Sequence, residues 1–515
     1  MNKRLLSLLL AVGMAATVFT ACGGEVETDG DASDSAGTTS AESDSDASEE
    51  TEWDEDPAEV TWMLWNVGGN ANEDGIQQVE DALNEITLAK INVKVDLQIL
   101  DMGTYMSQMP MQVSSGDKID LITTFPAGSG SFSAMQSAGQ LTPLKDLLEE
   151  YAPETLEVMP EVALKSTTVG DDIYGLPVLT DYTNDGYWVC RKSYLDEVGM
   201  TVDDIQSQED ITTAFEKMYA AHPELKMISS GAQNLTNSSG TQSNNIAYDS
   251  LGTDIVAVMV DKDPTKVVSY FETEEFKEEF KILQDWYKKG YIDKDVATRT
   301  QDPTADASVI SGFSGGNMLR VKGSDGLAGE PRIHAKLTEG YVTTSAISIM
   351  NMAVPTSATE PEAAVKLMNL CYTDKDVKQL VSYGIEGVNY TYTPEEGLVV
   401  NADSNYAPNT VGIFGNVLLC DPTAESIEIG YDMSKVSLDS LKYSPLLGFR
   451  IDYSNISSEE AALQTVFNEY KGTIMTGVAD DATYDEFIDK MYANGLQKYI
   501  DEVQKQLDEW YAAQE

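Results

Sequence analysis

The first 58 residues divide the chain into a part that cannot build a hydrophobic core and a longer part that can. Residues 23–58 hold 14 acidic side chains and no Lys or Arg, and their only sizeable apolar groups are Val26 and Trp53. Such a segment cannot bury enough apolar surface to offset the entropy lost on ordering, so it is expected to remain an extended tether. The remaining stretch of about 457 residues exceeds one typical core and predicts two lobes.

The extreme N-terminus has the pattern of an export signal. Two basic residues precede an apolar run from Leu5 to Phe19, which is too short to cross a hydrocarbon core of about 30 Å. We therefore expect residues 1–21 to be a cleaved signal peptide. The small residues before Cys22 resemble the bacterial lipobox, in which the cysteine is lipidated, although Phe19 stands where that motif usually has Leu, Val or Ile. An ordinary secretory cleavage site with a chance cysteine is the alternative.

Lipidation at Cys22 would place the protein on the extracytoplasmic face of the cell membrane, with residues 22–58 as the lipidated tether. The chain has 86 acidic against 33 basic residues and a formal net charge of −53. This charge argues against nucleic acids and anionic headgroups as partners, because phosphates would be repelled. We expect membrane contact through the lipid anchor only, and a monomer.

The other cysteines show no metal-binding pattern. Cys190, Cys371 and Cys420 lack CxxC spacing and allow at most one disulfide, and three thiols are the favoured interpretation. Neither a metal site nor a cofactor is expected.

The folded part opens with strands and helices in alternation. Strands are predicted at 60–65, 93–100 and 119–124, and helices at 73–89 and 105–115. This alternation predicts a mostly parallel sheet, whose ligands lie beyond the C-terminal ends of the strands.

Two helices later in the chain have clear end signals. Thr273 is a candidate N-cap for a helix that closes at Gly290, and its aromatic stripe is expected to be core. Residues 485–510 are predicted to be helical, with a break at Asn494 and Gly495.

Several segments, taken in order, resemble the extracellular solute-binding proteins of bacterial ABC importers, in the carbohydrate-type group called family 1. Those segments are Cys22, Thr61–Trp65, Tyr174–Pro177 and Ala353–Pro355 leading into Pro361–Asn369. Three more resemble a subgroup with a C-terminal domain of unknown function: Tyr383–Tyr390, Ser444–Phe449 and Glu502–Trp510. Asn389 departs from the His that is frequent there, so we expect the ligand to differ from the ligands of that subgroup. The resemblance covers nearly all of 59–515.

The resemblance implies an α/β, two-lobed fold of the periplasmic-binding-protein type (type II), with a hinge between the lobes. The first lobe is expected at 59–182 and 345–410, and the second at 183–344 and 411–515, including C-terminal helices. Such a subunit captures a sugar or oligosaccharide between its lobes and delivers it to a membrane permease without being an enzyme. A peptide-binding or signalling lipoprotein on the same fold and a surface carbohydrate hydrolase remain as alternatives.

A sugar site needs flat aromatic rings for the C–H faces and polar groups for the hydroxyl rim. For each aromatic residue, ordinary core packing is an equally strong interpretation. The candidate sugar-binding residues lie in loops at predicted strand ends and crossings: Trp65, Asn66, Phe125, Ser129, Tyr182, Tyr187, Trp188, Phe313, Glu386, Asn389, Tyr390 and Arg450.

One enzyme motif occurs formally. Residues 312–316 match G-x-S-x-G, but the only downstream histidine, His334, follows too closely to serve as the base of such a hydrolase. No catalytic residue is assigned.

Overall fold

The computed structural model describes residues 53 and 55–514, apart from 127, 229–236, 239–241, 244–246, 300–307 and 324–329. The predicted signal peptide, Cys22 and nearly all of the predicted tether lie outside the described residues. Within the described ranges, no helix is long and apolar enough to cross a membrane.

The first lobe is built on a five-stranded sheet of order β3-β1-β4-β16-β7. β1 runs parallel to β3 and β4, as predicted, whereas β16 runs antiparallel to both β4 and β7. β1 is buried on both faces, which its continuous apolar sequence requires. The strands are β1 (Ala58–Asn66), β3 (Val93–Asp101), β4 (Leu121–Thr123), β7 (Leu176–Pro177) and β16 (Asn351–Ala353).

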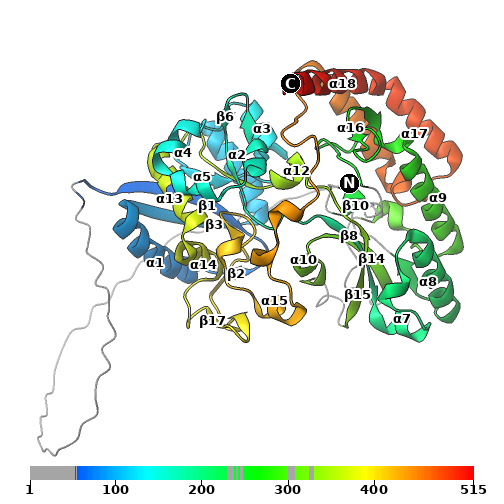
Figure 1. Cartoon of the computed structure of the whole chain (residues 1–515), viewed down its shortest axis with the longest axis horizontal. Coiled ribbons are helices and arrows are strands. Elements are labelled where there is room, and N and C mark those ends of the chain that lie inside the picture. The colour runs from blue at the N-terminus through cyan, green and yellow to red at the C-terminus, as the bar shows by residue number, and fades with distance from the viewer. Residues whose placement is uncertain are drawn as a thin grey trace, which may run out of the picture. The chain divides into compact units, whose positions relative to one another are not determined.

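Helices cover this sheet, with α1, α13 and α14 beside the blue and yellow strands in Figure 1. The Asn72 side chain caps α1 by accepting a hydrogen bond from the Gly75 N–H, and Asn92 ends the helix in a left-handed conformation. The first-lobe helices are α1 (Glu73–Ile91), α2 (Met102–Ser115), α3 (Phe132–Ser137), α4 (Lys145–Tyr151), α5 (Pro153–Val158), α6 (Glu161–Lys165), α13 (Pro361–Thr373) and α14 (Lys375–Tyr383).

The second lobe contains a four-stranded sheet of order β15-β8-β14-β9. β8 is antiparallel to both β14 and β15, and only β9 pairs in parallel, with β14. The prediction of a mostly parallel sheet therefore holds only for the β3, β1 and β4 part of the first lobe. The strands are β8 (Asp185–Arg191), β9 (Lys226–Ile228), β14 (Val309–Gly316) and β15 (Arg332–Thr338).

The helices of the second lobe form two groups, one beside the sheet and one at the C-terminal end of the chain (Figure 1). Thr273 caps α9 and Gly290 closes it, as predicted. The predicted break at Asn494 and Gly495 separates the last two helices. The helices are α7 (Lys192–Glu197), α8 (Gln208–Ala221), α9 (Glu274–Lys289), α10 (Met318–Gly323), α16 (Ser457–Ile474), α17 (Asp481–Ala493) and α18 (Leu496–Ala512).

Short elements complete the described part. Two short helices are α12 (Thr344–Ile347), near the hinge, and α15 (Ala424–Ile429). The two-stranded pairs are β2 (Asn70–Ala71) with β19 (Tyr406–Ala407), β5 (Thr168–Val169) with β6 (Asp172–Ile173), β10 (Asn237–Ser238) with β11 (Gln242–Ser243), β12 (Val256–Val258) with β13 (Val267–Ser269), and β17 (Tyr390–Thr393) with β18 (Gly397–Val400).

The packing of the hydrophobic core differs from the lobe boundary that was predicted at residue 411. Phe414 is fully buried with the first-lobe residues, and its ring packs edge-on against Trp62 at 5.2 Å. Tyr443 and Leu447 also pack on that core, whereas Leu446, Phe449 and Ile451 join the core of the C-terminal helices. The segment from 411 to about 444 therefore belongs to the first lobe, because its apolar side chains find their partners there.

The chain consequently passes between the lobes at three places, near residues 178–184, 339–348 and 444–450. The second and third crossings lie side by side, since the Val342 N–H donates to the Lys442 carbonyl at 2.8 Å and the Ser444 N–H donates to the Val342 carbonyl at 3.0 Å. This arrangement is the predicted hinge.

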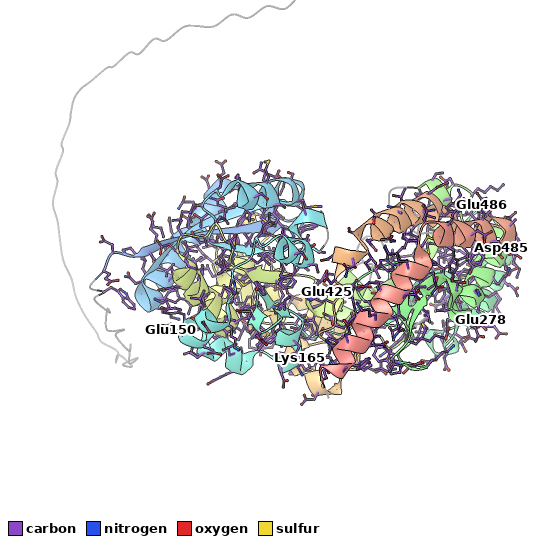
Figure 2. The ribbon with its side chains drawn as sticks, turned by 90° about the horizontal axis from the view of Figure 1, so that it is seen from above. Glu150, Lys165, Glu278, Glu425, Asp485 and Glu486 are labelled. Atoms are coloured by element: carbon purple, nitrogen blue, oxygen red, sulfur yellow. The ribbon has the colours of Figure 1, made fainter. Side chains whose placement is uncertain are left out.

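Charged side chains cover the outside of both lobes. Figure 2 labels exposed examples, among them Glu150 and Glu425 of the first lobe and Glu278 and Asp485 of the second. The three cysteines after Cys22 are free thiols, as favoured by the sequence, with Cys190 and Cys371 buried and Cys420 partly buried.

Candidate functional site

A cavity of about 480 Å³ lies where the two lobes and the hinge meet, within the range typical of small-molecule sites. Its lining comes from segments far apart in the sequence. First-lobe residues include Phe125 and Ser131–Ser133, and second-lobe residues include Asp249–Asp254. The rest of the lining is Thr344, Ser345, Ser348 and Ile349 near the second crossing, and Leu446, Phe449–Ile451, Tyr453, Glu460 and Gln464 after the third.

The first-lobe wall is aromatic. Phe125 follows β4 and is held by a hydrogen bond from its N–H to the Gly130 carbonyl at 2.7 Å. Its half-buried ring lies 5.3 Å from the ring of Trp65, which itself packs 4.9 Å from Tyr105. Trp65 is only 2 % exposed, so it supports Phe125 from behind while Phe125 faces the cavity.

Arg450 supplies a cation to the same cavity. Its guanidinium donates to the Ser348 hydroxyl at 2.8 Å, to the Ser133 hydroxyl at 3.3 Å and to the Ser166 carbonyl. It also lies 4.9 Å from the centre of the Phe132 ring. No carboxylate of the described chain is within ion-pair distance of it, its Nε has no hydrogen-bond partner, and burial lowers its pKa to about 10.

Three carboxyl groups line the cavity as well. Asp249 accepts hydrogen bonds from the Ser444 hydroxyl at 2.5 Å and from the Leu251 N–H at 2.9 Å. Burial raises the pKa of Asp249, of Asp254 and of Glu460. The Oε2 atom of Glu460 is enclosed and has no hydrogen-bond partner. The cavity thus combines aromatic rings, hydroxyls, a guanidinium and carboxylates, which is the chemistry that binds sugar hydroxyls and C–H faces.

A second polar cluster joins the lobes near the first crossing. The carboxylate of Asp181 accepts hydrogen bonds from the Tyr431 hydroxyl at 2.6 Å and from the Asn317 amide at 2.9 Å. Close by, Asp185 forms an ion pair with Lys336 at 2.8 Å, and the Tyr187 hydroxyl donates to it at 3.4 Å. Through Asp181, the segment of Tyr431 that precedes the third crossing is connected to Asn317 of the second lobe.

The structure brings only some of the predicted site residues together. Phe125 and Arg450 line the cavity, and Ser129 is exposed on the turn between Phe125 and Ser131. Tyr182 is nearly buried in the first crossing with φ +50°, and its hydroxyl has no partner. The Asn66 side chain holds the turn at Gly69 through two hydrogen bonds.

Four of the predicted residues lie on the second-lobe sheet or in the 384–400 region and have structural roles. Trp188 is corrected to a core residue, because its ring has no exposed surface and its Nε1–H donates to the Ser311 hydroxyl at 3.0 Å. Half-buried Phe313 is paired opposite Trp188 and packs on the same core. Asn389 accepts from the Ile385 N–H at 2.9 Å and so holds its own loop, and Tyr390 accepts from the Gln379 amide at 2.8 Å and so ties that loop to α14.

Glu386 is exposed in that loop, and neither it, Asn389 nor Tyr390 lines the cavity. Five further residues line the cavity without having been predicted from the sequence: Ser133, Ser348, Asp254, Tyr453 and Glu460. Nothing in their local sequence distinguishes them from the many other acidic and hydroxyl residues.

The formal hydrolase motif is not a nucleophile elbow. Ser314 lies within β14, paired with Tyr187 of β8, instead of at a sharp turn between a strand and a helix. Among the described residues, no group of three or more His, Cys, Asp or Glu side chains could hold a metal ion.

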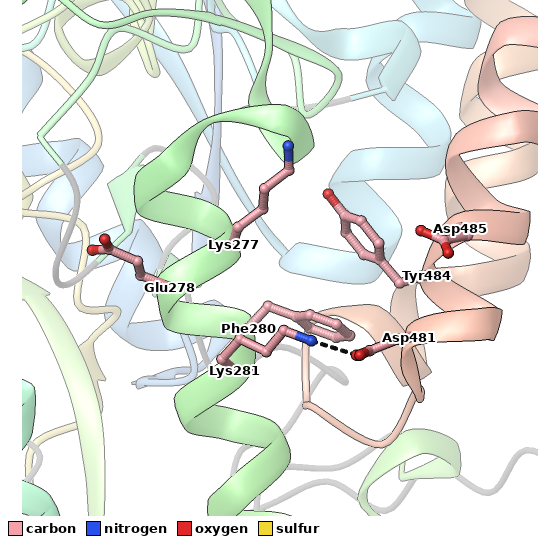
Figure 3. A pocket seen from close by; sticks show the side chains of 7 residues that line it. All are labelled: Lys277, Glu278, Phe280, Lys281, Asp481, Tyr484 and Asp485. Carbon is pink, nitrogen blue, oxygen red and sulfur yellow. Dashed lines mark hydrogen bonds and ion pairs between the residues drawn. The ribbon is translucent and has the colours of Figure 1, made fainter.

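Other cavities lie within one part of the molecule. Figure 3 shows a groove of about 400 Å³ between α9 and α17, where Lys281 pairs with Asp481 at 2.5 Å beside Phe280 and Tyr484. A further one of about 330 Å³ lies around α15. Each of these two is lined by residues of one lobe, whereas the cavity at the hinge is lined by residues of both lobes and is therefore the candidate site.

Comparison with known proteins places the chain in a family. Residues 76–378 match the model of the bacterial extracellular solute-binding proteins, and residues 445–512 match a domain of unknown function. A protein of Streptococcus pneumoniae described as a carbohydrate ABC transporter substrate-binding protein is 24% identical over 454 residues, covering 85% of this chain and 88% of that protein.

Solved structures share the fold. The N-glycan transport solute binding protein (NgtS) of Streptococcus pneumoniae matches with a TM-score of 0.77 at 21% identity, covering 89% of this chain and 100% of that one. A solute-binding protein of Bifidobacterium longum infantis described as binding HMO matches with a TM-score of 0.64 at 17% identity, covering 88% and 99%. The two-lobed α/β fold is therefore confirmed, and the chain belongs to the bacterial extracellular solute-binding proteins.

Proposed function

We propose that the chain is the substrate-binding subunit of a carbohydrate ABC importer, attached to the outer face of the cell membrane through lipid on Cys22. It captures an oligosaccharide between its lobes and passes it, chemically unchanged, to a membrane permease. The observation that carries this proposal is the cavity at the hinge, which sets Phe125 of the first lobe against polar groups from the second.

The composition of the cavity supports a sugar as the ligand. The face of Phe125 offers a flat surface for sugar C–H groups, and Arg450, Ser133 and the carboxylates offer donors and acceptors for hydroxyls. Charged groups in an enclosed site form stronger hydrogen bonds to hydroxyls than neutral groups do. The relatives agree, since one is described as a carbohydrate transporter subunit and others were solved with Man1GlcNAc or kestose.

The proposed function requires the two lobes to close around the bound ligand. A ligand that touches both lobes stabilises the closed form, because it makes its full set of contacts only there. Ser129 lies on the turn that lines the cavity, and Tyr182 and Tyr187 lie at or just after the first crossing; we include them, and Asn66 at the end of β1, with Phe125 and Arg450 as the binding surface. Phe313 remains a candidate through its half-buried side chain on β14, and Glu386 remains one only through its exposed position.

The experiment is a binding screen on the mature protein with N-glycan fragments, milk oligosaccharides, fructo-oligosaccharides and short peptides. A ligand at about 100 times its dissociation constant adds about 2.7 kcal/mol to the free energy of unfolding, which raises the melting temperature measurably. Stabilisation by a glycan without any product supports the proposal. Stabilisation by peptides alone would support the peptide-binding alternative, and accumulation of shorter glycans would support a hydrolase.

Two variants locate the site once a ligand is found. Arg450→Gln is expected to weaken binding about tenfold or more, because charge-assisted hydrogen bonds contribute about 1.5–3 kcal/mol. Arg299→Gln is the matched control, since Arg299 pairs with Asp293 in the second lobe and does not line the cavity. Equal affinities of the two variants would place the ligand elsewhere.

A further inference from the structure

The charges that line the cavity are unbalanced. Asp249, Asp254 and Glu460 contribute three carboxyl groups, and Arg450 contributes the only guanidinium or ammonium group of the lining. In the part of the chain that the structure describes, no ion pair neutralises any of these four side chains. Lys471 lowers the pKa of Asp254 from a distance, but burial is the larger effect and raises it.

Asp254 and Glu460 act as one negatively charged surface. Asp254 follows the second-lobe segment that lines the cavity, and Glu460 projects from the first turns of α16. They are close enough that the charge of Asp254 raises the pKa of Glu460. Glu460 Oε2 is enclosed without a well-aligned hydrogen bond, although the Tyr499 hydroxyl lies close enough to lower the pKa of Glu460, so this surface can accept further hydrogen bonds.

In the described part of the chain, no ion pair joins Arg450 to this surface. Its guanidinium already donates to Ser133, Ser166 and Ser348 and lies against the Phe132 ring. Those partners hold it toward the first lobe, whereas Asp254 and Glu460 belong to the second-lobe side of the lining. A ligand that spans the cavity must therefore meet the two carboxylates.

We propose that this cavity accepts uncharged glycans and excludes glycans that carry a carboxylate, and that Asp254 and Glu460 are the residues that exclude them. The inference rests on the proposed function, because it specifies the class of glycan bound at the same site. Glycan hydroxyls donate hydrogen bonds to the two carboxylates. A ligand carboxylate would bring a like charge into an enclosed site beside these two carboxyl groups.

The test compares glycans that differ by one acidic group. An N-glycan without sialic acid and the same glycan with one sialic acid form one pair, and lacto-N-tetraose with its sialylated form is a second. Affinities of the mature protein are measured by calorimetry at pH 8, because burial raises the pKa values of Asp254 and Glu460 and a higher pH favours their charged forms. We expect at least one neutral member to bind, and its sialylated counterpart to bind at least tenfold more weakly.

The decisive variant is Asp254→Asn combined with Glu460→Gln. It is expected to bind the sialylated glycan at least tenfold more tightly than the original protein does, which is a gain that loss of folding cannot produce. The control is Glu278→Gln with Asp485→Asn, which removes two exposed acidic groups near the groove of Figure 3 and changes net charge equally. The control is expected to leave the affinity for the sialylated glycan unchanged.

The outcomes separate this inference from the proposed function. If the original protein binds both members of a pair equally, the exclusion of acidic glycans is wrong while the oligosaccharide function stands. If the double variant gains no affinity for the sialylated glycan, Asp254 and Glu460 do not exclude it. If no glycan binds at all, the proposed function itself fails.

Discussion

The Tyr431 hydroxyl donates a 2.6 Å hydrogen bond to Asp181, a carboxylate that is only 2 % exposed at the first crossing between the lobes. The same carboxylate oxygen accepts from the Asn317 amide, which precedes α10 of the second lobe. Burial raises the pKa of Asp181, and the two donors oppose that rise. This cluster therefore holds the lobes in the arrangement that the structure shows.

Replacing Tyr431 by Phe removes one of these donors and leaves a buried carboxylate less well satisfied. We expect the free energy of unfolding to fall by about 1–3 kcal/mol, and the lobes to separate more easily. Urea denaturation measures the first effect and small-angle scattering of the ligand-free protein the second. Tyr492→Phe, at an exposed tyrosine bonded to Glu272, serves as the control. Identical scattering and stability in both variants would contradict the role given to this cluster.

Lys378 predicts an unusual dependence of stability on pH. Its ammonium group is fully buried, donates to the Val411 and Phe414 carbonyls at 2.8 and 2.7 Å, and burial lowers its pKa from 10.5 to about 8. Between these values the unfolded chain holds a proton that the native protein lacks, so this residue makes stability rise with pH. Below pH 8 the full penalty for burying the charge is present.

The measurement is the difference in the free energy of unfolding between the original protein and Lys378→Met, which cannot titrate. From pH 7 to pH 10 the original protein should gain about 2–3 kcal/mol relative to the variant. Lys281→Met, which removes an exposed ion pair with Asp481, should give a nearly constant difference. A constant difference for Lys378→Met as well would mean that the buried amine stays protonated up to about pH 10, so that its pKa is not lowered by burial.

Trp188 and Phe125 should respond to substitution in opposite ways. Trp188→Ala is expected to reduce the free energy of unfolding by about 3–5 kcal/mol, because it opens a cavity in the core around Phe215. Phe125→Ala should cost less stability, since its ring is half-buried, but should weaken glycan binding by more than about 1 kcal/mol. Denaturation and calorimetry at a temperature where both variants are folded distinguish the two. Weaker glycan binding by folded Trp188→Ala would return that ring to the binding surface.

Cys22 should determine where the mature protein resides. We expect the original protein to incorporate radioactive palmitate in cells and to sediment with membranes. Cys22→Ser, which has no thiol to acylate, should incorporate none. Labelling of both proteins, or of neither, would favour the ordinary secretory cleavage site over the lipobox interpretation.

The elements that the sequence predicted well are those with strong local signals. The Thr273 cap and Gly290 stop of α9, and the break between α17 and α18, follow from side chains that act on their own helix. The position of Phe125 was predictable because loops after parallel strands converge on one edge of the sheet.

The predictions that were wrong depend on packing between residues that are far apart in the sequence. The burial of Trp188 depends on Phe215 and Ser311, and the attachment of Phe414 to the first lobe depends on Trp62, more than 300 residues earlier. Asn389 was a candidate because it stands where the resembling subgroup frequently has His, yet its side chain bonds to its own loop. Glu460 could not be selected from among 86 acidic residues before α16 was placed beside Asp254.

The position of β16 constrains when the protein can fold. This strand lies between β4 and β7 in the first-lobe sheet, although it follows them by well over a hundred residues. The sheet therefore stays divided during synthesis until the ribosome has passed residue 353 and the entire second-lobe sheet has been made. A nascent chain that reaches the export machinery early is still unfolded, which is the condition that threading through a narrow translocation channel requires.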